Sequence, residues 1–187
     1  MTRSKCNNRG MSLIELVVVI AILAVLATGF IGIMGILGGK QAREAAQDIA
    51  ASLGKIRVMT MSKSTGAAVE AAGADVYLKV NRDNSGNIMI QQVVSGTVTD
   101  SIVIKGNHIS HFYLYIAKGG NSDIPGGTVP VELDENGIIL AYDRGNGTFL
   151  PFSAVNETYT KQLKIMEGTR TYSIKLVPAT GKTELGD

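Results

Sequence analysis

The chain has 187 residues, with 18 Lys and Arg against 16 Asp and Glu and a formal net charge of +2. This balance argues against a general nucleic-acid-binding domain, which needs clustered basic charge to contact phosphates. The single cysteine, Cys6, excludes an intramolecular disulfide.

The first element in chain order is an apolar run of 24 residues without a charge, at 16–39. Because an α-helix needs roughly 20 apolar residues to cross a hydrocarbon core, this run predicts a helix that can span a bilayer. Glu15 lies at its N-terminal edge, where burial of a lone carboxylate in lipid costs about 2.5 to 3.5 kcal/mol or more. We therefore expect Glu15 to have a partner and a function.

Two simpler interpretations of this run remain open. A secretory signal peptide would use Arg3, Lys5 and Arg9 as its basic region and 25–27 as its cleavage site, but the apolar core of such peptides is only about 7 to 15 residues long. Here the apolar stretch continues to residue 37 without a polar cleavage region. A plain single-pass anchor is the other interpretation, and it explains neither Glu15 nor the junction at Gly10.

The residues around this junction form a motif: Gly10, Met11, Ser12, Leu13, Ile14, Glu15 and Leu16. The motif resembles the class III signal of the type IV pilin and pseudopilin family, in which Phe usually occupies the position of Met11. The resemblance implies that a prepilin peptidase cuts between Gly10 and Met11 and methylates the new α-amine of Met11. The other implied partners are further pilin or pseudopilin subunits, an assembly platform with its ATPase, and the membrane.

The resemblance also implies an assembly role for Glu15. Its carboxylate can pair with the α-ammonium of Met11 on a neighbouring subunit, which neutralises both charges among apolar helices of low dielectric. Such a pair would set the axial register of a filament. Removal of residues 1–10 also removes Cys6 and three basic residues, which leaves 15 basic residues against 16 acidic ones.

Beyond residue 39 the apolar residues continue at helical spacing. Within 40–63 they are Ala42, Ala45, Ala46, Ile49, Leu53, Ile56 and either Met59 or Thr60. No proline interrupts this region. We therefore predict one rod from about Ser12 to Met61, roughly 75 Å long at about 1.5 Å per residue, with its first half in lipid and its second half under a head. The apolar half is interrupted by glycines, at 29, 32, 35, 38 and 39. Two interpretations of them stay open: they bend or locally melt the helix, or they serve only close helix packing.

After residue 64 the pattern changes to short alternating runs separated by Gly, Asn and Asp. It predicts strands at 75–80, 87–94, 97–104, 112–117, 137–142, 148–152, 161–166 and 170–177, and an exposed loop at 118–127. The predicted fold class is α+β, with a long N-terminal helical spine packed against an antiparallel β-sheet head. The expected segments are a leader at 1–10, a transmembrane and polymerisation helix at 11–39, an amphipathic half of the helix at 40–63 and the β-rich head at 64–187.

Two segments are similar to a minor subgroup of the family, the H-type pseudopilins and T-type minor pilins. One is the run of small residues, Leu and Arg at 46–57, and the other is the ending at 172–182, a strand followed by Thr, Gly and a basic residue. Some T-type members bind DNA through a basic C-terminal motif. Here Lys182 is followed by Glu184 and Asp187, so DNA is not expected among the partners.

No catalytic or metal-binding motif is predicted. His108 and His111 are three positions apart, which in a strand places them on opposite faces, so we expect solvated histidines rather than a metal pair. Residues 81–86 resemble a calcium loop but begin with Asn and lack the bidentate Glu, and 134–137 contain the hairpin signal Asn-Gly. We expect turn chemistry at both places, no cofactor and no enzymatic activity.

These features predict a structural subunit of a type IV pilus-like filament. It would be inserted in the inner or cytoplasmic membrane with a cytoplasmic N-terminus, then displayed in a periplasmic or extracellular filament. The alternatives are a pseudopilin of a type II secretion system, a minor pilin of a DNA-uptake system, and a membrane-tethered binding or adhesion module that never polymerises. Cleavage at Gly10 and the carboxylate of Glu15 discriminate between them, because a tether needs neither.

Overall fold

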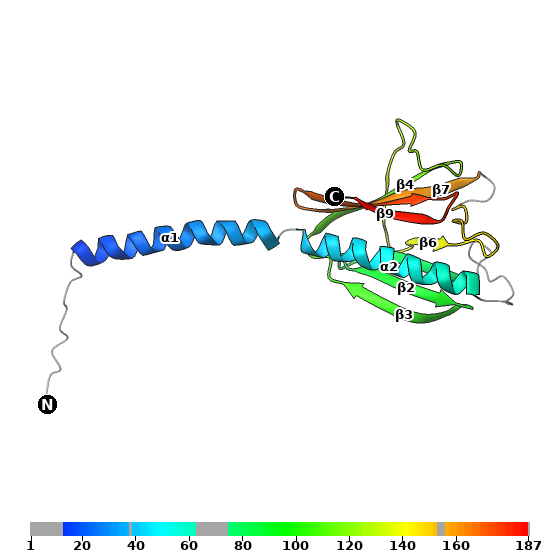
Figure 1. The fold of residues 1–187 in the computed structure, drawn as a ribbon. Coiled ribbons are helices and arrows are strands. Elements are labelled where there is room, and N and C mark those ends of the chain that lie inside the picture. The colour runs from blue at the N-terminus through cyan, green and yellow to red at the C-terminus, as the bar shows by residue number, and fades with distance from the viewer. Residues whose placement is uncertain (1–12, 38, 63–74, 153–155, 187) are drawn as a thin grey trace, which may run out of the picture. The chain divides into compact units, whose positions relative to one another are not determined.

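The computed structural model describes residues 13–37, 39–62, 75–152 and 156–186. The chain divides into two compact units, residues 1–37 and residues 38–187. The first contains one helix, and the second contains a helix and all the described strands (Figure 1).

The helix of the first unit is α1 (Leu13–Leu37), with Glu15 in its first turn. A carboxylate at this end of a helix interacts favourably with the helix dipole. Within the part of the chain that the structure describes, no helix has the length and apolar content required of a membrane span. The assignment of residues 11–39 as a transmembrane segment therefore stays a prediction.

The second unit begins with α2 (Lys40–Ser62), which buries one face. The buried positions are Ala42, Ala45, Ala46, Ile49, Ser52, Leu53, Ile56 and Thr60. This stripe confirms the predicted helical spacing, and Thr60 rather than the half-buried Met59 completes it. Burial of Thr60 is tolerated because its hydroxyl donates to the carbonyl oxygen of Ile56 at 2.9 Å.

The predicted rod from Ser12 to Met61 is not one helix, because α1 ends at Leu37 and α2 begins at Lys40. Between them, Gly39 has a φ of +90°, a conformation outside the helical region that glycine adopts without a Cβ penalty. The backbone N–H of Arg43 donates to the carbonyl oxygen of Gly39 at 3.1 Å, as in the first turn of a new helix.

The strands of the predicted antiparallel region form two separate sheets. One sheet contains β1 (Val76–Arg82), β2 (Ile88–Val94), β3 (Thr97–Ile104) and β6 (Ile138–Ala141), in the order β3-β2-β1-β6. The other contains β4 (Ile109–Lys118), β5 (Val131–Glu132), β7 (Thr158–Glu167), β8 (Arg170–Val177) and β9 (Lys182–Gly186), in the order β5-β4-β7-β8-β9. The predicted α+β class is confirmed.

Most strands lie where alternation predicts them, and β3 and β8 match the prediction at both ends. The strand predicted at 148–152 is wrong, because Phe149 makes only an isolated bridge with Tyr142. Two edge strands, β5 and β9, are not predicted. The first has only two residues and the second is mainly polar, so neither carries an alternating apolar pattern.

The second unit has one hydrophobic core, in which α2 packs against both sheets (Figure 1). Fully buried aliphatic side chains from all three layers meet there, among them Leu53 on α2, Leu78 on β1 and Leu163 on β7. Burial of each such side chain contributes about 1.5 to 3 kcal/mol. The core therefore holds α2 firmly in one body with the β-rich segment predicted at 64–187. The described residues of this body, 39–62, 75–152 and 156–186, are called the head below.

Candidate functional site

The predicted processing residues, Gly10 and Met11, lie outside the described residues. Glu15 is described and lies in the first turn of α1. Cleavage at Gly10, methylation of Met11 and the registry role of Glu15 therefore stay predictions.

In the head, the two segments that resemble the H and T subgroup meet. Arg57, near the end of α2, donates from Nη2 to the carbonyl oxygen of Thr180 at 2.8 Å. Its guanidinium carbon lies 6.0 Å from the ring centroid of Tyr142, which is within cation–π range. Arg57 thus fastens the turn between β8 and β9 to the helix.

Glycine is required where this turn meets the rest of the head. Gly181 has a φ of +64°, and a Cβ at this position would lie 1.9 Å from the carbonyl oxygen of Gly147. Tyr142 and Phe149 stack nearby, with ring centroids 4.4 Å apart. Burial raises the pKa of the Tyr142 hydroxyl well above its ordinary value, so this ring stays neutral. The Thr-Gly pair in the C-terminal segment therefore has a packing role in this chain.

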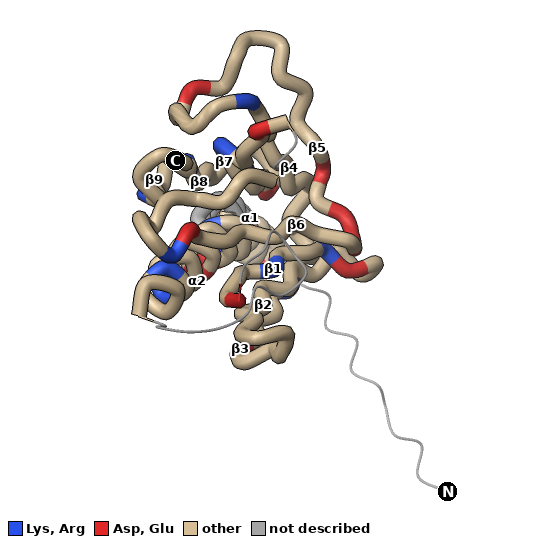
Figure 2. Tube along the Cα trace, turned by 90° about the vertical axis from the view of Figure 1, so that its right-hand side faces the viewer, with Lys and Arg blue, Asp and Glu red and all other residues tan. Residues whose placement is uncertain are grey.

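The charged residues of β9 do not form a basic patch together with Arg57. Lys182 pairs with Glu184 at 3.2 Å, and both side chains are largely exposed. Such a pair contributes only about 0 to 1 kcal/mol to stability, but it places an acid beside the basic residue. Basic and acidic residues are likewise interspersed over the head in Figure 2.

His108 and His111 are both exposed, which confirms the prediction of solvated histidines. The backbone N–H of His108 donates to the side-chain oxygen of Gln41 at 3.3 Å. On β4, His111 stacks on Tyr113 with centroids 5.2 Å apart, and its Nδ1 lies 3.2 Å from the carboxylate of Glu132. This carboxylate cannot be found from the sequence, because Glu132 belongs to the two-residue strand β5.

The two segments with a weak likeness to calcium ligands form hydrogen-bonded turns. Asp83 accepts from the backbone N–H and the side-chain amide of Asn87, at 2.8 Å each. Asp134 accepts from the amide of Asn136 at 2.8 Å and from the backbone N–H of Gly137 at 3.0 Å. These bonds, chiefly those from the two Asn side chains, hold the pKa of both carboxyls below its ordinary value. The turn interpretation is confirmed, and among the described residues no group of three or more His, Cys, Asp or Glu could hold a metal.

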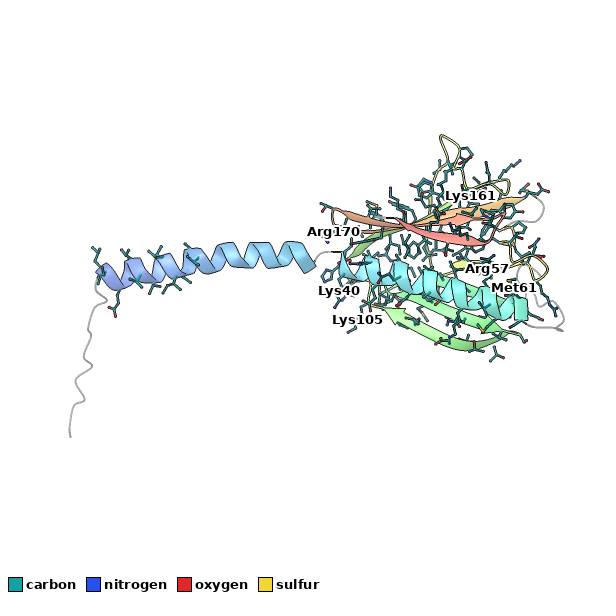
Figure 3. The ribbon with its side chains drawn as sticks, viewed as in Figure 1. Lys40, Arg57, Met61, Lys105, Lys161 and Arg170 are labelled. Carbon is teal, nitrogen blue, oxygen red and sulfur yellow. The ribbon has the colours of Figure 1, made fainter. Side chains whose placement is uncertain are left out.

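A buried cation on β7 is not predicted by the sequence analysis. The ammonium of Lys161, a residue labelled in Figure 3, donates to the backbone carbonyl oxygens of Gly119 and Asn121. Its Nζ also lies 3.3 Å from Oδ1 of Asn121. Desolvation lowers the pKa of this ammonium, while the charge of Asp123 acts in the opposite direction. The alternation of β7 contains the signal, because Lys161 shares a face with the buried Leu163. Lys161 therefore anchors the glycine-rich loop after β4, whose tip is exposed as predicted.

Replacing Lys161 with Met is expected to lower the free energy of unfolding by about 2 kcal/mol, because two carbonyl oxygens lose a charged donor. Residues 119–127 should also become more susceptible to limited proteolysis. Lys164→Met is the matched control, since Lys164 lies on the same strand but is only half-buried. Indistinguishable denaturation curves and cleavage patterns for the two variants would contradict the anchoring role.

The N-terminal region matches a known family model. The prokaryotic N-terminal methylation motif matches residues 5–31, a segment that contains Gly10, Met11 and Glu15. No curated protein and no solved structure matches the chain.

Proposed function

We propose that this chain, which carries the class III prepilin signal of type IV pilins and pseudopilins, is a structural subunit of a type IV pilus-like filament. The observation that carries the proposal is the match at residues 5–31, which contains Gly10, Met11 and Glu15 in one motif. In this proposal the protein acts by assembly and has no catalytic turnover.

Processing is the first step. A prepilin peptidase removes residues 1–10 and methylates the α-amine of Met11, which leaves a mature chain with 15 basic and 16 acidic residues and no cysteine. The platform protein and its ATPase then move the subunit from the membrane into the filament. The partners are therefore the peptidase, the assembly machinery and other subunits of the same or a related kind.

The membrane step is supported by the sequence of the N-terminal region. Residues 16–39 contain no charge, and their number exceeds the roughly 20 residues that a membrane-spanning helix needs. The subunit is held in the inner or cytoplasmic membrane with its N-terminus in the cytoplasm until it is assembled. Glu15 then pairs with the α-ammonium of Met11 on a neighbouring subunit, because neither charge is stable alone among apolar helices.

Within this class, we propose a minor pilin or pseudopilin of the H or T type. The segments at 46–57 and 172–182 support this assignment. The hydrogen bond from Arg57 to the carbonyl oxygen of Thr180 joins the two segments, which explains why they occur together. Such a subunit would serve a secretion, motility, adhesion or DNA-uptake system. The acid beside Lys182 disfavours DNA capture by the tail itself.

The proposal is tested by blocking processing. Gly10→Val adds a β-branched side chain where the prepilin signal has glycine, so we expect the variant to keep residues 1–10, remain in the membrane fraction and disappear from sheared surface material. Asn8→Val is the control, because it places the same side chain in the leader but away from the cut. Equal amounts of Gly10→Val and wild-type protein in the sheared fraction would overturn the proposed pathway.

The alternative of a tethered binding or adhesion module predicts a different result. A tether remains functional with its leader attached and needs no carboxylate at position 15. Normal ligand or surface binding by cells carrying Gly10→Val, with no filament in the wild type, would favour the tether.

A further inference from the structure

The start of α2 has no cap of its own. Gly39 occupies the position before the first helical residue, where a Ser, Thr, Asp or Asn side chain normally accepts a backbone N–H. The first turn of α2 also contains no acidic residue. Ala42 in this turn is fully buried, so its N–H cannot bind water and needs an acceptor from another part of the chain.

Glu167, the last residue of β7, supplies one of these acceptors. Its Oε2 accepts from the backbone N–H of Ala42 at 2.8 Å, although the two residues are 125 positions apart. Ala42 is the third residue of α2, where an ordinary cap would act, and the side chain of Glu167 is buried. Its carboxylate also supplies the negative charge that favours a helix N-terminus.

The neighbouring strand β8 restricts Gly39 directly. A Cβ on Gly39 would lie 2.7 Å from Cδ of Arg170 and 3.2 Å from the hydroxyl oxygen of Tyr172. Figure 3 shows Arg170 and Lys40 at the same end of the head. The β7–β8 hairpin therefore supplies the cap through Glu167 and occupies the space beside Gly39.

We propose that the β7–β8 hairpin is a conformational device that interrupts the N-terminal helix. In a continuous helix the N–H of Ala42 would donate to the carbonyl oxygen of Gly38, four residues earlier. In the structure the same N–H donates to Glu167 and Gly39 has a positive φ. The N–H of Ala42 can thus donate either to the carbonyl oxygen of residue 38 or to the carboxylate of Glu167. The bond to Glu167 stabilises the conformation in which the helix is interrupted at Gly39. The choice can be measured on the chain whether or not it polymerises.

The device is tested by the distance between two spin labels on the full-length chain in detergent. The labels are placed on Ala21→Cys and Ala51→Cys, both at exposed positions, with Cys6→Ser to remove the natural thiol. A continuous helix places these positions about 45 Å apart at roughly 1.5 Å per residue. We expect Glu167→Ala to raise the ratio of continuous to broken helix about fivefold, the effect of a lost cap.

Two further variants separate the device from a general loss of structure. Glu167→Gln keeps an acceptor oxygen and should retain most of the wild-type distance distribution. Gly39→Ala leaves Glu167 unchanged but cannot adopt the broken conformation easily, so it should also enrich the 45 Å population. Gly54→Ala, within α2 and with open space around its Cβ, should change nothing. The proposal is overturned if Glu167→Ala and Gly39→Ala both give the wild-type distribution.

Discussion

Glu15→Ala is expected to reach the membrane in normal amounts and to fall by about tenfold or more in assembled filaments, because it leaves the α-ammonium of Met11 without a partner among apolar helices. The loss is specific to assembly, since replacing a carboxylate with a methyl group only makes the segment more apolar. Quantitative immunoblotting of membrane and sheared fractions measures both effects.

Glu44→Ala is the matched control for this variant. Glu44 is an exposed acid on α2, so its replacement changes the net charge equally without touching the N-terminal motif. Filament incorporation should then equal that of the wild type. If Glu15→Ala is recovered from the sheared fraction as efficiently as Glu44→Ala, the registry role of Glu15 is wrong.

Gly181→Ala is expected to lower the free energy of unfolding by about 3 kcal/mol, since it combines a strained backbone with a steric collision. The added Cβ would lie 1.9 Å from the backbone oxygen of Gly147, so one of the two turns must move. That movement would also stretch the bond between Arg57 and Thr180. Chemical denaturation of the full-length chain in detergent measures the loss.

Gly168→Ala separates the two causes. Gly168 has a φ of +60°, close to that of Gly181, but a Cβ there meets nothing within 4 Å. Gly168→Ala should therefore lower the free energy of unfolding only by the cost of the strained backbone, about 1 to 2 kcal/mol. Equal losses in the two variants would contradict a close contact between the turns at Gly181 and Gly147.

The predictable parts of the fold are those in which local pattern and burial agree. The face of α2 that contains Ile49, Leu53 and Ile56 is visible from its helical spacing, and β8 is visible from strict alternation. The glycines of the apolar run permit a break before α2, but local pattern does not show at which glycine the helix ends. The position of the break depends on Glu167, which is distant in sequence, and on space around Gly39 that is occupied by side chains of β8.

The same distinction applies to functional features. Gly10, Met11 and Glu15 can be identified from the sequence because their spacing within one short motif carries the signal, and the family match covers them. The contact of Arg57 with Thr180 and the anchoring by Lys161 require the tertiary fold, since each joins residues that lie far apart in the sequence. The local sequence indicates the Lys161 contact only through one lysine on the apolar face of β7.

Intact mass spectrometry of the protein from cell envelopes and sheared surface material tests the central claim most directly. The account predicts a chain that begins at Met11 and carries one added methyl group on its α-amine, present in both fractions. A chain that retains residues 1–10, or one that begins at Thr28 after signal-peptide cleavage, would contradict it.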